Sequence, residues 1–123
     1  KKLSADEREG LIEYLEEFAP YETADVGGNK FILVHGGVPY DKRDIPLSKQ
    51  SVHELVIEHP DYSKRYYNNA YLVTGHTPTV NIGEEYAGKI FKANGHIAID
   101  CGAGYGMPLG CMRLDDFKEF YVE

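Results

Sequence analysis

The chain has few cysteines and no long apolar run. Its two cysteines, Cys101 and Cys111, are not spaced as a CxxC pair, so a disulfide framework is not expected and two reduced thiols in a cytoplasmic protein are the simpler interpretation. Every apolar run is far shorter than the ~20 residues of a membrane-spanning helix. We therefore expect a cytoplasmic protein with no membrane partner.

Basic residues are also scarce. The chain has 13 Lys and Arg against 20 Asp and Glu, a formal net charge of −7. Binding to nucleic acid normally needs a basic stripe that neutralises phosphates, and no such stripe is present, so we expect no nucleic-acid partner. With 42% apolar residues, 123 residues fit one globular domain or part of a larger one.

A helix is predicted near the amino terminus and a second one further along. The first begins with a capping box, Ser4 and Glu7, and ends before Pro20. The second begins near Ser48 and stops before Pro60. In the first helix the apolar residues follow helical spacing: Leu11, Ile12, Leu15 and Phe18.

The other patterns predict strands. Residues 21–37 read as two strands joined by a turn at Gly27, Gly28 and Asn29, and residues 71–74 as a buried strand. Asn94-Gly95 predicts a hairpin within residues 89–100, and a second pair of strands surrounds Asp115-Asp116. The fold class is therefore mixed α/β, of the α+β sandwich type, with two helices and six or seven strands.

Two of these strands end alike. "FILVHGG" and "YLVTGHTPT" each place a histidine, His35 or His76, beside glycine just after an apolar run. Ligands of α/β proteins lie at the carboxyl ends of strands, and neutral imidazole suits Zn, Mn or Fe. A single histidine at a strand end is more often a hydrogen-bonded structural residue, so from the residues alone both interpretations stay open.

Three stretches together resemble a known family. "LVHGG", "VTGHTPT" and "HIAIDCGAGYGMPLGCMRLDD" are similar, in order and spacing, to the later motifs of the phosphoprotein phosphatases, a group of calcineurin-like metallophosphoesterases. The resemblance covers nearly all of residues 1–123. It implies the carboxyl-terminal portion of such a domain, a β-sandwich flanked by helices, with the portion that carries the remaining ligands absent.

The resemblance implies a specific site. His35 and His76 would bind one of two divalent ions (Mn, Fe or Zn), and a metal-activated hydroxide would attack phosphorus. Gly36 would shape the rim, and Tyr105 would lie close to the substrate phosphate. His59 stands where bacterial relatives carry a phosphate-binding arginine, and the alternatives for that role are Arg43 and Arg65.

The motifs G-D-x-H-G, G-D-x-x-D-R-G and G-N-H-E, which carry the other ligands and the catalytic histidine, do not occur in residues 1–123. We therefore expect weak metal binding, no turnover by this chain alone, and no catalytic residue within it. The implied activity is hydrolysis of a phosphorylated protein (Ser/Thr) or a small phosphoester. Dinucleoside tetraphosphate hydrolysis, or a non-catalytic half-domain with a binding or regulatory role, are the alternatives.

Other polar residues have simpler explanations. We expect His96 to be exposed or cross-strand, His53 to be solvated on its helix, and Asp100 to cap a turn. An unpaired sheet edge invites association, so self-association or pairing with the amino-terminal half is expected.

Overall fold

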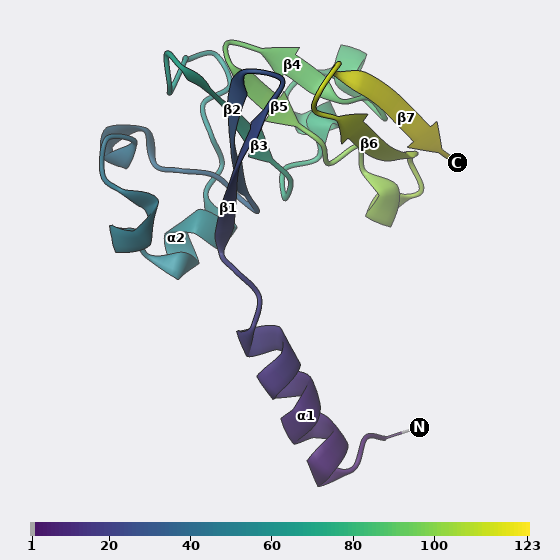
Figure 1. Cartoon of the computed structure of the whole chain (residues 1–123). Helices are drawn as coiled ribbons and strands as arrows, with labels where there is room; N and C mark the ends of the chain where they lie inside the picture. Colours follow the sequence, from purple (N-terminus) through teal and green to yellow (C-terminus); the bar gives the residue numbers. More distant parts are fainter. Residues whose placement is uncertain (1) are drawn as a thin grey trace.

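The computed structural model describes residues 2–123 and confirms a mixed α/β fold with two helices and seven strands. A five-stranded sheet has the order β1-β2-β3-β5-β4, and β6 and β7 form a separate hairpin beside it (Figure 1). None of the described helices is long and apolar enough to span a membrane. The bounds are α1 Ala5–Glu16, β1 Tyr21–Val26, β2 Asn29–Val34, α2 Val52–Ile57, β3 Ala70–Thr74, β4 Phe91–Ala93, β5 His96–Ala98, β6 Leu109–Arg113 and β7 Lys118–Val122.

The local turn chemistry follows the sequence. Ser4 and Glu7 form the predicted capping box of α1, and Asn94 and Gly95 both have positive φ, as the tight turn between β4 and β5 requires. Strands β6 and β7 pair antiparallel around Asp115-Asp116 as predicted.

The predicted second helix is too long. Residues Leu47–Lys49 form a separate 3₁₀ turn, and α2 covers only Val52–Ile57. The chain is extended at Gln50, whose side-chain amide donates to the Lys42 and Ile45 carbonyls. Contacts with the preceding loop therefore override helical propensity here.

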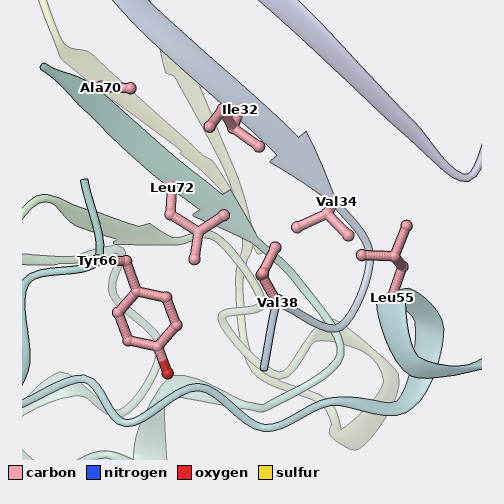
Figure 2. Close-up of a cluster of buried hydrophobic side chains, with 7 residues drawn as sticks. All are labelled: Ile32, Val34, Val38, Leu55, Tyr66, Ala70 and Leu72. Carbon is pink, nitrogen blue, oxygen red and sulfur yellow. The ribbon is translucent and has the colours of Figure 1, made fainter. Parts of the chain in front are cut away.

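Each face of the five-stranded sheet carries a buried cluster. On one face Ile32 and Val34 of β2 and Leu72 of β3 meet Leu55 of α2, as Figure 2 shows. The opposite face carries Phe31, Val73, Ile90, Ile97 and Cys101, against which Met112, Leu114 and Phe117 of the β6–β7 region pack.

His96 lies in the interior. Its cross-strand position is confirmed, because it pairs with Leu72 in register, but its predicted exposure is wrong, because only 1% of the side chain is accessible. The ring contacts the Tyr62 and Tyr66 rings edge-on, and its Nε2 donates to the Lys64 carbonyl at 2.8 Å. Burial lowers the pKa of His96. His53 is exposed on α2, as predicted.

Candidate metal and phosphate site

Parallel strands bring His35 and His76 together. β2 and β3 are parallel with Val34 opposite Thr74, so the residues that follow both strands leave the sheet at one edge. The Gly75 amide donates to the His35 carbonyl at 2.9 Å. This hydrogen bond joins the segment that follows β2 to the segment that follows β3. The imidazole centroids of His35 and His76 are 5.1 Å apart.

His76 has an unusual backbone. Its φ is +61°, in the left-handed region that costs a non-glycine residue about 1–2 kcal/mol. The Thr77 amide donates to the Gly75 carbonyl at 2.6 Å, closing a tight turn around His76. Strained backbone of this kind concentrates at functional sites because the surrounding structure must impose it.

A third imidazole lies beside the pair. The centroid of His59 is 4.9 Å from that of His76, and His59 Nδ1 is 2.7 Å from Thr77 Oγ1. His59 is exposed, whereas Thr77 is buried. The hydroxyl therefore fixes one ring nitrogen of His59, and Nε2 remains for a ligand.

Gly36 and Gly37 serve the docking of α2. Both amides donate to the Leu55 carbonyl, at 2.8 and 3.2 Å, and a Cβ on Gly36 would meet the Val56 carbonyl oxygen at 2.5 Å. Because the Gly36 amide already has this partner, it is not available to a phosphate. Gly36 instead sets the distance between the His35 turn and the helix that leads to His59.

Tyr105 lies at the exit of the third parallel strand, β5. The Thr79 amide donates to the Asp100 carbonyl at 2.8 Å, so the loops after β3 and β5 are joined. Asp100 Oδ1 accepts from the Gly102 amide at 3.0 Å, which confirms its turn-capping role. Tyr105 itself is 80% exposed and borders a small hollow with Pro78 and Met107.

Arg43 is occupied elsewhere. Its guanidinium carbon lies 4.1 Å from the Tyr40 ring centroid, its Nη1 donates to the Tyr40 carbonyl at 2.6 Å, and Asp44 is 3.7 Å away. Arg65 donates to the Tyr67 carbonyl at 3.3 Å. These contacts tie both arginines to their own loops, whereas His59 lies beside the histidine pair.

Two residues of the site had no predicted role. Thr77 holds His59, and Tyr62 OH lies 3.2 Å from Thr74 Oγ1 beneath the same turn. Burial raises the pKa of Tyr62. The sequence shows the threonine after His76 directly, in "VTGHTPT". No residue near Tyr62 in the sequence indicates that its hydroxyl contacts Thr74, the last residue of β3.

The histidine pair fits part of a metal site. With metal–nitrogen distances of about 2.1 Å, two imidazoles on one ion have ring centroids roughly 4.5–5.2 Å apart, and the observed 5.1 Å lies in this range. Among residues 2–123, no group of three or more His, Cys, Asp or Glu side chains is placed to hold an ion. The described residues therefore offer two candidate ligands, fewer than a metal site needs.

Comparison with known proteins adds no family assignment. No protein-family model matches this chain, and no curated protein matches it significantly.

Proposed function

We propose that this chain contributes one part of a dinuclear metallophosphoesterase site of the phosphoprotein phosphatase type, acting on phosphorylated protein or a small phosphoester. The observation that carries the proposal is the meeting of His35 and His76 at the exits of adjacent parallel strands. The motif resemblance supports it, since both histidines lie in the motifs that supply ligands. The remaining ligands would come from outside residues 1–123.

The chain's own residues have distinct tasks in this proposal. His35 and His76 each offer a ring nitrogen to a divalent ion, which when bound polarises the phosphoryl group and lowers the pKa of water. Thr77 orients the His59 ring, and His59 Nε2 donates to a phosphate oxygen. A neutral imidazole makes one such bond, whereas arginine makes two, so we expect weaker phosphate binding than an arginine would give.

The first experiment is zinc binding to the chain as it exists, measured by calorimetry and by shifts of histidine ring signals in NMR. His35→Ala and His76→Ala should each raise the zinc Kd at least about tenfold, because each removes one of two ligands. His53→Ala is the matched control, since His53 is exposed on α2, and it should leave Kd unchanged. Equal zinc affinity in all three variants would refute the ligand assignment.

The second experiment uses the reading frame upstream of residue 1 in the source gene. If it encodes the three missing motifs, the complete enzyme should hydrolyse p-nitrophenyl phosphate with Mn²⁺. His35→Ala or His76→Ala should then lower kcat/KM by roughly 100-fold or more. Full activity in either variant would overturn the proposal even if zinc binds.

A further inference from the structure

The Tyr62 ring is held in place beside the end of β3. It packs edge-on against Phe91 and His96, with ring centroids 5.5 and 5.3 Å away. The Tyr62 backbone carbonyl accepts from the Asn94 side-chain amide at 3.0 Å. Because both the ring and the backbone are fixed, the hydroxyl is directed at one group, Thr74 Oγ1 at 3.2 Å.

Two threonine hydroxyls lie between Tyr62 and His59. Thr74 is 1% exposed and Thr77 is 8% exposed, so bulk water is a poor substitute for their partners in the protein. Burial raises the pKa of the Tyr62 phenol, and the hydroxyls of Thr74 and Thr77 beside it lower that pKa. Thr77 Oγ1 is in turn 2.7 Å from His59 Nδ1. Polar groups therefore lead from Thr74 and Tyr62 through Thr77 to the imidazole.

The direction of these hydrogen bonds decides which ring nitrogen of His59 carries the proton. A neutral imidazole has one N–H and one lone pair. If the Thr77 hydroxyl donates to Nδ1, the proton is on Nε2, and if Thr77 accepts from Nδ1, Nε2 is a bare lone pair.

The buried end of the path favours one direction. When Thr74 donates to Tyr62, Tyr62 to Thr77 and Thr77 to His59 Nδ1, every hydroxyl proton has an acceptor. In the reverse direction the Thr74 proton would have no acceptor among residues 2–123, and an unpaired buried donor is costly. Hydroxyls that donate in sequence also strengthen one another in a buried site.

We propose that Tyr62 is a positioning residue that acts through Thr77 to hold His59 in the tautomer whose Nε2 carries the proton. His59 then presents a hydrogen-bond donor to an oxyanion beside the His35–His76 pair. In this tautomer Nε2 has no free lone pair for a metal ion, so His59 is an anion donor and not a third ligand. The identity of the anion as phosphate rests on the proposed function, whereas the tautomer does not.

Nuclear magnetic resonance of the histidine ring nitrogens tests the assignment on the intact chain. Long-range proton–nitrogen spectra distinguish a protonated ring nitrogen from a bare one at about pH 8, where an ordinary imidazole is neutral. We expect Nε2 of His59 to be protonated in the parent. Tyr62→Phe keeps the ring and removes the hydroxyl, so the ratio of the Nε2–H to the Nδ1–H tautomer should fall by about two- to tenfold, the factor that one hydrogen bond supplies.

Two controls separate this role from a purely structural one. His96 contacts the Tyr62 ring and donates from Nε2 to the Lys64 carbonyl, so unchanged His96 signals in Tyr62→Phe show that the fold is kept. Tyr86→Phe removes a hydroxyl from another ring that packs edge-on against Phe91, and it should leave the His59 ratio at the parental value.

A double variant tests the path itself. Thr77→Val removes the hydroxyl between the phenol and the imidazole, so adding Tyr62→Phe to it should change the His59 ratio no further. The proposal is refuted by a parent chain with the proton on Nδ1, by a ratio that Tyr62→Phe leaves unchanged, or by an equal effect of Tyr62→Phe with and without Thr77. These measurements use neither zinc nor turnover, so their failure is distinct from failure of the proposed function.

Discussion

Gly36→Ala should destabilise the protein far more than the addition of a single methyl group suggests. A Cβ at residue 36 would meet three backbone atoms of the α2 segment: the Val56 carbonyl oxygen at 2.5 Å, the Val56 carbonyl carbon at 2.7 Å and the Glu58 amide nitrogen at 2.9 Å. Because these are backbone atoms, no rotamer change relieves the clash. Helix α2 must move, and both hydrogen bonds to the Leu55 carbonyl weaken.

The magnitude follows from two contributions. Overpacking a close contact costs about 1–3 kcal/mol, and each weakened hydrogen bond adds about 1 kcal/mol or less, so we expect a loss of about 2–4 kcal/mol. With an m-value of about 1.5 kcal/mol/M for urea, the unfolding midpoint measured by circular dichroism should fall by roughly 1.3–2.7 M.

Gly104→Ala is the matched control. A Cβ there meets nothing within 4 Å, so the same chemical change should shift the free energy of unfolding by less than about 0.5 kcal/mol. If Gly36→Ala unfolds at the same urea concentration as Gly104→Ala, the close approach of α2 to the His35 turn is refuted.

Two further predictions concern the core. Leu55→Ala empties a fully buried position on α2 and should lower the free energy of unfolding by about 2–5 kcal/mol, whereas half-exposed Ile57→Ala should cost under about 1 kcal/mol; equal effects would place Leu55 outside the core. Burial lowers the pKa of His96 below its ordinary value of 6.5, so the unfolded state binds the proton more tightly. The stability contribution is complete above about pH 6.5 and is lost as the pH falls toward the folded-state value. Urea titrations from pH 7.5 to about 5 should show a smaller pH slope for His96→Asn than for the parent.

Elements with local signals were predictable. The Ser4–Glu7 capping box and the Asn94-Gly95 turn each depend on residues within four positions of one another, and both are present. The extent of α2 was not predictable, because Gln50 makes its hydrogen bonds to a loop five to eight residues earlier. Pro60 at the far end, by contrast, marks a boundary that the sequence shows directly.

The site divides in the same way. The meeting of His35 and His76 follows once both strands are taken as parallel neighbours, because their ends then share one sheet edge. The position of His59 depends on how α2 docks against Gly36, which is a tertiary contact. The burial of His96 was missed because the Tyr62 and Tyr66 rings that cover it lie about thirty residues earlier in the chain.

The left-handed backbone at His76 restricts which amino acids evolution can place there. Glycine, asparagine, aspartate and histidine tolerate this conformation best, while β-branched and bulky residues do not. Of these four, histidine and aspartate also bind divalent ions well. The left-handed backbone of the turn after β3 therefore disfavours most substitutions of His76, whatever the chemistry of the side chain. Selection on backbone conformation alone would tend to keep a metal-binding type of residue at this position.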